Sequence, residues 1–143
     1  MERANAYTKQ FLDAANEETS SFKPTAERRS FGGQMLHLSD ANYGMAYVAS
    51  GTPSPYKYGD LEKGSLKTKA EISKSVLDSY DFMITEAKGM TDGKLAGSVK
   101  IFNMEMPAET LLAKAFKHQT HHREQTTVYL RLKGLKPPPE KLF

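Results

Sequence analysis

Apolar side chains recur every three or four residues along most of this 143-residue chain, which is the spacing of one face of an α-helix. The pattern occupies a short segment near residues 7–15 and longer segments at about 30–49, 68–90 and 107–133. Two longer connections separate the later segments, at 56–67 and 91–106. Helices with one apolar face bury those faces against one another. We therefore predict an all-α fold, an antiparallel four-helix bundle with two longer connecting loops, as a single domain over residues 1–143.

Residues at the expected helix ends support these boundaries. Thr68 and Glu71 have the spacing of a capping box, in which each side chain bonds the other residue's backbone amide. Ser30 can cap the second segment, because its hydroxyl can accept from the unpaired amides of the first turn. Gly134 is expected to end the last segment, with Leu135 folding back onto the preceding turn.

Two details fit a plain helical pattern less well. Gly32 and Gly33 fall in the first turn of the second helix, where each is less favourable than alanine by roughly 1 kcal/mol. Close approach of a neighbouring helix would explain them. Within the connection 91–106, residues 99–102 have the composition of a short extended piece.

The chain has no cysteine, so a metal ion would bind to histidine, aspartate or glutamate, and thiol chemistry would need a thiol from outside.

Twenty basic and 17 acidic residues leave a net charge of only +3, which gives little support for nucleic-acid binding. Residues 114–141 are more basic than the rest of the chain. This stretch is either a solvated surface or a positive rim that attracts anionic substrates. No segment approaches the roughly 18 apolar residues of a membrane span. We expect a cytoplasmic protein without nucleic-acid or membrane partners.

Three of the four histidines lie between residues 118 and 122. His118 and His122 are four residues apart, so on a helix they project from the same face, where two neutral imidazoles can share a metal ion. His37 lies on the core-facing stripe of the second helix. A lone histidine on such a stripe is usually a hydrogen-bonded core residue and less often a metal ligand. If His37 is a third ligand, the site would keep an open coordination position. His121 points about 100° away from His122 and is expected at the surface or in a supporting role.

The last part of the chain carries a recognisable motif. Residues 118–139 read HQTHHREQTTVYLRLKGLKPPP, which resembles the H-x-x-H-H-R-G-Q and V-Y-L-R-x-x-G-x-x-P-P pattern of the DinB/YfiT-like superfamily of metalloenzymes. Residues 22–25 and 30–41 resemble the second-helix region of the same family, so the likeness covers nearly the whole chain. Competing motifs are missing: the sequence has no His-Glu-x-x-His, P-loop, dinucleotide fingerprint or nucleophile elbow.

The resemblance implies a four-helix bundle that binds a divalent metal ion through His37, His118 and His122. Zinc or nickel is expected, with iron, copper and manganese as alternatives. The polar side chains expected to support these ligands are Gln34, His121, Arg123 and Gln125. Two positions depart from the family pattern. Glu124 stands where the family commonly has glycine, and we expect it to be a surface residue or to form a salt link with Arg123 or Arg131. Lys117 stands where the family commonly has asparagine.

By the same resemblance, the leading hypothesis for function is a thiol S-transferase or related detoxification enzyme that uses an external low-molecular-weight thiol and an electrophilic substrate. A second hypothesis is a metal-dependent hydrolase, for which Asp40 and Glu124 are the available general bases. A third is a non-catalytic, metal-stabilised binding or dimerisation module. We expect a homodimer. The residues that carry out catalysis are not identifiable from the sequence.

Overall fold

The structure, a computed structural model, describes residues 1–65 and 68–141, so the last two residues of the expected connection 56–67 lie outside the described part. Within this part the chain is mostly helical, as predicted, and has two short strands. In chain order the elements are α1 (Glu2–Ala14), α2 (Glu17–Ser21), α3 (Phe31–Ser50), α4 (Asp60–Lys63), α5 (Lys69–Gly89), α6 (Asp92–Ala96), β1 (Ser98–Ile101), β2 (Met104–Pro107) and α7 (Ala108–Leu132). None of the described helices combines the length and the apolar character needed to cross a membrane.

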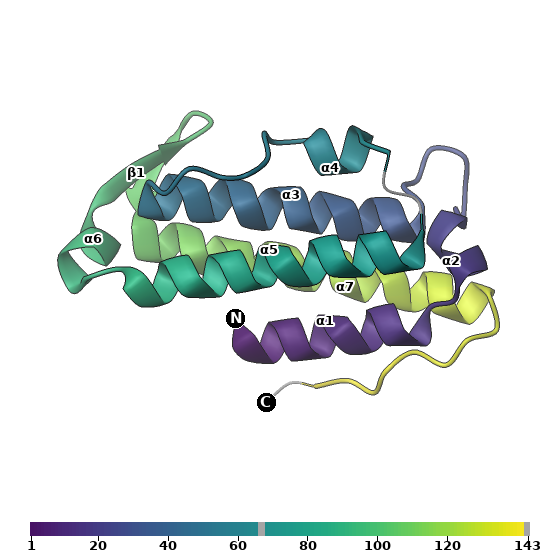
Figure 1. Cartoon of the computed structure of the whole chain (residues 1–143). Helices are drawn as coiled ribbons and strands as arrows, with labels where there is room; N and C mark the ends of the chain where they lie inside the picture. The colour runs from purple at the N-terminus through teal and green to yellow at the C-terminus, as the bar shows by residue number, and fades with distance from the viewer. Residues whose placement is uncertain (66–67, 142–143) are drawn as a thin grey trace.

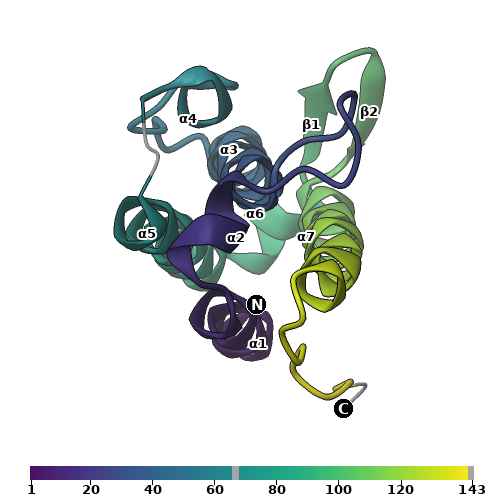
Figure 2. The ribbon, with the colours of Figure 1, turned by 90° about the vertical axis from the view of Figure 1, so that its right-hand side faces the viewer.

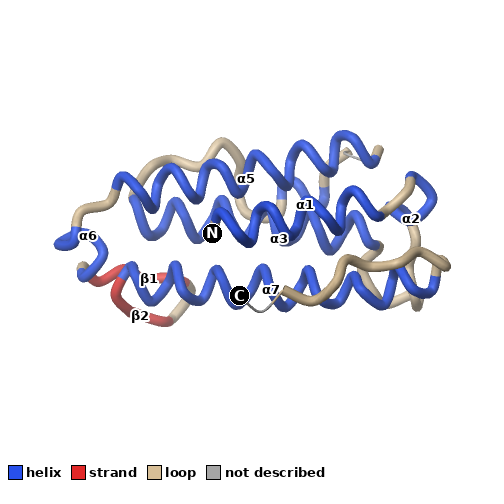
Figure 3. Tube along the Cα trace, turned by 90° about the horizontal axis from the view of Figure 1, so that it is seen from below, coloured by secondary structure: helices blue, strands red, loops and turns tan. Residues whose placement is uncertain are grey.

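The longest helices, α1, α3, α5 and α7, lie side by side (Figures 1 and 2). Helix α3 packs against α5 on one side and α7 on the other, and α1 packs against the same two helices. The two strands form a hairpin at one end of this group, where α3 ends and α7 begins (Figure 3). The short helices α4 and α6 lie in the two connections that the sequence predicted as loops, and α2 lies between the first and second predicted helices.

Helices α3 and α5 run in the same direction, because residues 51–59 and α4 carry the chain back along the length of α3 (Figure 1). Gly32 lies against Ile72 near the beginnings of the two helices, and the Asn42 amide donates to the Ser79 hydroxyl at 3.1 Å farther along both. The expected antiparallel arrangement therefore holds for the pairs α1/α5 and α3/α7 but not for α3/α5 or α1/α7, which are parallel (Figure 1). A connection as long as 51–68 permits this parallel pairing.

The space between the long helices is filled by apolar side chains from all four. Phe11 of α1, Leu38 of α3, Tyr80 of α5 and Leu130 of α7 are each fully buried. The Tyr80 hydroxyl donates to the side-chain oxygen of Gln119 at 2.7 Å, which satisfies a polar group that would be costly to bury alone. This core holds α3 and α7 in fixed register, on which the candidate site depends.

The helix starts match the sequence predictions. The Ser30 hydroxyl accepts from the amide of Gly33 at 3.0 Å and caps α3. Thr68 and Glu71 form a complete capping box at the start of α5, with both reciprocal hydrogen bonds present. These caps involve residues only three positions apart, which is why the sequence reveals them.

The end of α7 also follows the prediction. Gly134 has a positive φ of 70°, and the amide of Leu135 donates to the carbonyl of Leu130 at 2.9 Å. This is the fold-back expected after a glycine in the left-handed conformation. The beginning differs slightly: Pro107 ends strand β2 and serves as the N-cap residue, so α7 begins at Ala108.

The expected extended piece at 99–102 is one strand of a hairpin. Val99 pairs with Met106 in an antiparallel register, and the turn between the strands places Phe102 at a φ of 52°. A bulky residue seldom adopts this left-handed conformation, which costs energy that the surroundings must supply. Phe102 is also the most exposed of the large hydrophobic side chains described, at 72%.

Candidate metal centre

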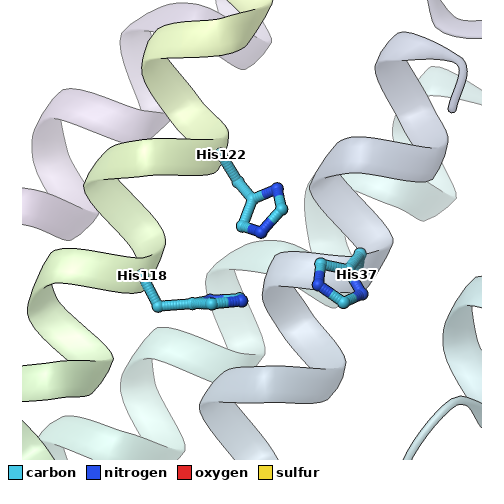
Figure 4. A group of neighbouring side chains, drawn as sticks. All are labelled: His37, His118 and His122. Atoms are coloured by element: carbon cyan, nitrogen blue, oxygen red, sulfur yellow. The ribbon is translucent and has the colours of Figure 1, made fainter. Parts of the chain in front are cut away.

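Three histidines from two helices lie together between α3 and α7. His37 projects from α3, while His118 and His122 project from α7, and the three rings point toward one another (Figure 4). The centroid of the His37 ring is 5.3 Å from that of His118 and 4.6 Å from that of His122, and the two α7 rings are 4.4 Å apart. Each residue offers one ligand nitrogen, and these nitrogens all lie within 4.8 Å of one another. The group could therefore hold a metal ion, with small side-chain shifts bringing the nitrogens to bonding distances of about 2.0–2.1 Å.

The helix packing explains how residues 81 positions apart meet. His118 and His122 share one face of α7 because they are one turn apart. Antiparallel packing of α3 on α7 then places His37 opposite that face. Ala41 and Ala115, both buried alanines one turn away, take up little of the space between the two helices.

Gln34 orients the ring of His122. The side-chain oxygen of Gln34 lies 2.8 Å from His122 Nδ1, and because an amide oxygen only accepts, Nδ1 carries the proton and donates. The Gln34 amide nitrogen donates in turn to Gln125 at 2.9 Å and to the Tyr129 hydroxyl at 3.3 Å. Nε2 of His122 is therefore the nitrogen with a free lone pair, as in many histidines that bind metals.

Glu62 does the same for His37. A Glu62 carboxylate oxygen lies 2.8 Å from His37 Nδ1, and its other oxygen accepts from Arg29 Nε at 2.5 Å. Burial alone would raise the pKa of Glu62, but the hydrogen bonds and charges of Arg29 and His37 outweigh it and hold that pKa below its ordinary value. The buried Asp40 fixes α4 in place, since its carboxylate accepts from the backbone amides of Leu61 at 3.2 Å and Glu62 at 2.9 Å. Because Glu62 accepts the proton on His37 Nδ1, Nε2 of His37 keeps a free lone pair.

No pattern in the sequence points to Glu62 as a partner of the histidines. Glu62 lies in a four-residue helix inside a connection and has no periodic relation to the histidines. Its contact with His37 depends on the path of the chain back along α3. The one local signal was Asp40, one turn after His37 on the same helix. Its buried carboxylate needs hydrogen-bond donors, which another segment of the chain must supply.

The four polar residues expected around the ligands take different places. Gln34 and Gln125 lie in the hydrogen-bonded group behind His122, and His121 joins it through a 2.7 Å contact between its Nε2 and the Gln125 amide nitrogen. The Arg123 side chain, in contrast, is buried against α1. Its guanidinium donates to Gln119 at 2.8 Å and stacks on the Tyr7 ring at 4.3 Å. The structure therefore places Arg123 with the core and not beside the three histidines.

Glu124, Lys117 and Asp40 were named above as departures from the family pattern or as possible general bases, and none of them belongs to the group of three ligands. Glu124 is half-exposed and accepts from Arg123 Nε at 3.2 Å, so it is a surface residue that also forms the salt link with Arg123. Lys117 is exposed. Both oxygens of Asp40 are occupied by backbone amides, although burial raises its pKa and those amides only partly oppose the rise.

Two cavities open on different sides of the histidine group. A polar one of about 450 Å³ includes His122 together with Arg28, Arg29 and Glu62 in its walls. A larger one of about 680 Å³ includes His118 and is lined mostly by apolar side chains of α3, the connection after it and the hairpin. One histidine of the group, His118, thus borders the apolar space and another, His122, borders the charged one.

The family model for the DinB superfamily matches residues 1–126. The chain belongs to the DinB superfamily. No curated protein matches it. A search of solved structures finds a DinB-like protein from Bacillus cereus, with 21% identity, a TM-score of 0.83, and coverage of 96% of this chain and 91% of that one. A DinB-like protein from Bacillus subtilis has 16% identity and a TM-score of 0.76, covering 95% of this chain and 90% of that one. At these identities the likeness shows the fold.

Burial makes two of the three histidines of this DinB-superfamily chain poor bases. Desolvation, followed by the positive charge that His37 and other neighbours would carry, lowers the pKa of His118 to about 4. Desolvation, followed by the charge of His118, lowers the pKa of His122 to about 3. Both imidazoles are therefore neutral at pH 7, which is the form that binds metal ions.

We expect the metal-free protein to lose stability in mild acid. In the unfolded chain these histidines have a pKa near 6.5, so between about pH 6.5 and pH 3 the unfolded state binds more protons than the folded state. The free energy of unfolding is therefore highest above about pH 6.5, falls progressively as the pH drops toward the two folded-state values, and levels off below them. Urea unfolding of chelator-treated protein at pH 7.5, 6.0 and 5.0 measures this loss. His118→Gln, which keeps only one of the two lowered pKa values, should show a smaller fall. A free energy of unfolding that does not fall with pH in the original protein would contradict the prediction.

Glu62→Ala should weaken metal binding about 10–100-fold, the usual cost of removing a partner that orients a ligand histidine. Without the carboxylate, nothing holds the proton on His37 Nδ1 and the ring can turn its free nitrogen away. Competition with a chromophoric chelator measures the affinity. Glu27→Ala is the matched control, because Glu27 lines the same polar cavity, and its carboxylate bonds to Thr25 and its own backbone. Equal losses of metal affinity in both variants would show that Glu62 contributes only its negative charge and does not orient His37.

Proposed function

We propose that this chain is a metal-dependent enzyme, a thiol S-transferase that joins an external low-molecular-weight thiol to an electrophilic substrate in detoxification. The observation that carries the proposal is that the group of three imidazoles borders two cavities, an apolar one through His118 and a polar one through His122. This arrangement offers space for two different reactants beside one ion. The absence of cysteine agrees with it, because the reacting thiol must then come from outside the chain.

The residues present suit a divalent ion that promotes loss of a thiol proton. His37, His118 and His122 would hold the ion through neutral imidazoles, so its full positive charge would lower the pKa of a thiol beside it. Glu62 and Gln34 keep two of the ligand rings in the required tautomer. The thiol proton passes to solvent, a sulfur–carbon bond forms, and the leaving group departs with its electron pair.

The polar cavity suits the thiol. Many small thiols carry carboxylates, and the cations that line this cavity are Arg28 and Arg29 from the connection before α3. Among the described residues of the basic stretch 114–141, no lysine or arginine lines it. The expected attraction of an anionic reactant is therefore assigned to residues 28 and 29.

The geometry favours transfer over hydrolysis. A hydrolase needs a general base near the bound water, but Asp40 accepts two backbone amides and Glu62 is engaged by His37 and Arg29. A purely structural metal site would not need cavities on both sides of its ligands. We keep the hydrolase and the non-catalytic module as outcomes of the test below.

The proposal includes four further expectations. The metal is zinc or nickel, and the four long helices form a four-helix bundle. The enzyme works in the cytoplasm as a homodimer. Elemental analysis of purified protein tests the metal. Light scattering at micromolar concentration tests the dimer, and a monomer would contradict that part.

The function is tested with chelator-treated protein reloaded with zinc or nickel. The loaded protein is mixed with a panel of small thiols and 1-chloro-2,4-dinitrobenzene, and the thioether product is followed by absorbance. We expect a rate above that of the thiol alone which disappears in metal-free protein and in His118→Ala. No rate enhancement with any thiol would overturn the transferase, and hydrolysis of an ester by the same preparation would favour the hydrolase.

A further inference from the structure

The apolar cavity beside His118 has features that point to the kind of molecule it binds. It lies over α3, between the connection 51–59 and the hairpin, which are on the same side of that helix (Figures 1 and 2). Its volume of about 680 Å³ is in the range of small-molecule sites. Because His118 belongs to both the wall and the histidine group, a molecule in this cavity would lie next to the ligand nitrogens.

Four aromatic side chains line this cavity: Tyr47, Tyr56, Tyr58 and Phe102. All four are unusually exposed for large rings, with 47%, 44%, 61% and 72% of their surface accessible. Leaving so much aromatic surface in water forgoes burial that each ring could otherwise gain. A ligand that covers the rings would recover part of this free energy, and aromatic ligands would add favourable ring–ring contacts.

The hairpin turn adds an independent sign. Phe102 lies at a φ of 52°, a conformation that glycine adopts far more readily than phenylalanine. Asn103 follows it and would also tolerate that conformation better. Strained positions of this kind tend to occur at ligand sites. A phenylalanine here costs stability without gaining a buried ring, which is explained if the ring contacts a ligand.

Charged side chains are few in the wall of the apolar cavity. Lys57 is the single charged side chain among the described residues that line the apolar cavity, whereas Arg28, Arg29, Glu27 and Glu62 line the polar one. Arg28 and Arg29 give the polar side the guanidinium groups that pair well with a carboxylate, so we assign the thiol to that side. The two reactants would approach the histidine group from different directions, without competing for one space.

We propose that the apolar cavity binds an uncharged aromatic electrophile, and that Tyr47 and Phe102 determine this specificity. The inference rests on the proposed thiol transfer, for which it names the class of the second substrate. The sulfur of the thiol bonds to an electrophilic carbon of the aromatic compound, whose leaving group departs with the bonding electron pair. The thiol proton goes to solvent.

Binding is tested apart from catalysis, with the unreactive probe 2-naphthalenemethanol and the full-length protein. We expect NMR shift changes at residues 47, 58, 102 and 118, and an affinity about 3–10-fold weaker in both Tyr47→Ala and Phe102→Ala, the size of one lost ring contact. Phe116→Ala is the matched control, because Phe116 is a half-exposed ring that lines a different cavity, between α1 and α7. Shifts that cluster around residue 116, or no saturable binding, would overturn the proposal.

Catalysis is then compared for 1-chloro-2,4-dinitrobenzene and the small polar electrophile iodoacetamide. Tyr47→Ala and Phe102→Ala should lower kcat/KM about 3–10-fold for the aromatic compound and leave iodoacetamide unchanged. Equal effects on both compounds would overturn the specificity while transferase activity remained. If no thiol is transferred at all but the naphthalene probe binds as expected, the proposed function fails and the aromatic site stands.

Discussion

Replacing His122 with alanine should lower the affinity for zinc or nickel by more than about a hundredfold, beyond the usual effect of losing an orienting partner. The change removes one of three nitrogens that lie within 4.8 Å of one another and leaves a site with two ligands. It also leaves the side-chain oxygen of Gln34 without the proton it accepts from His122 Nδ1. His37→Ala should have a similar effect, because His37 is the contribution of α3 to the group. Chelator competition and elemental analysis of the purified variants measure both losses.

His121→Ala separates loss of a ligand from loss of a neighbouring imidazole. The His121 ring is 5.0 Å from that of His122, yet its Nε2 contacts Gln125 and it does not belong to the group of three. Its removal should change metal affinity little. Undiminished metal content in both His37→Ala and His122→Ala would show that the three histidines are not the site, whatever the behaviour of His121→Ala.

The features that depend on residues close in sequence could be predicted. The caps at Ser30 and Thr68 and the fold-back after Gly134 are determined within a few residues. The convergence of His118 and His122 needs only one helical turn. His37 could be added because it lies on the core-facing stripe of a helix that had to pack against the other, and because the motif resembled a family.

Features that depend on the path of the connections could not be predicted. The parallel direction of α3 and α5 follows from the return of residues 51–59 along α3, and no local pattern specifies it. That same return brings Glu62 to His37 and builds one wall of the apolar cavity. Arg123 was expected near the ligands from its place in the motif. Its position on α7, one residue from His122, turns it instead toward Tyr7 and the core.

Gly32→Val should destabilise the metal-free protein by about 2–3 kcal/mol, near the upper range for overpacking a tight contact. The two glycines at the start of α3 are unfavourable by propensity, and the structure explains the first. A Cβ at position 32 would lie 2.7 Å from Cδ1 of Ile72 and 3.0 Å from the carbonyl oxygen of Ser20. Ile72 can move to some extent, but the backbone of Ser20 cannot do so without shifting α2. Urea unfolding of chelator-treated protein measures the change without a contribution from metal binding.

The same substitution at Gly44 tests whether close packing is the cause. Gly44 is also inside α3, but a Cβ there would meet only Cδ2 of Tyr58, at an ordinary 3.5 Å. Valine at this position should leave the free energy of unfolding within about 0.5 kcal/mol, because valine is a slightly better helix former than glycine. Similar losses at both positions would attribute the effect to a β-branched residue in α3. A loss at position 32 alone would show that this glycine is needed for α3 to approach α2 and α5, the contact that fixes the start of the helix carrying His37.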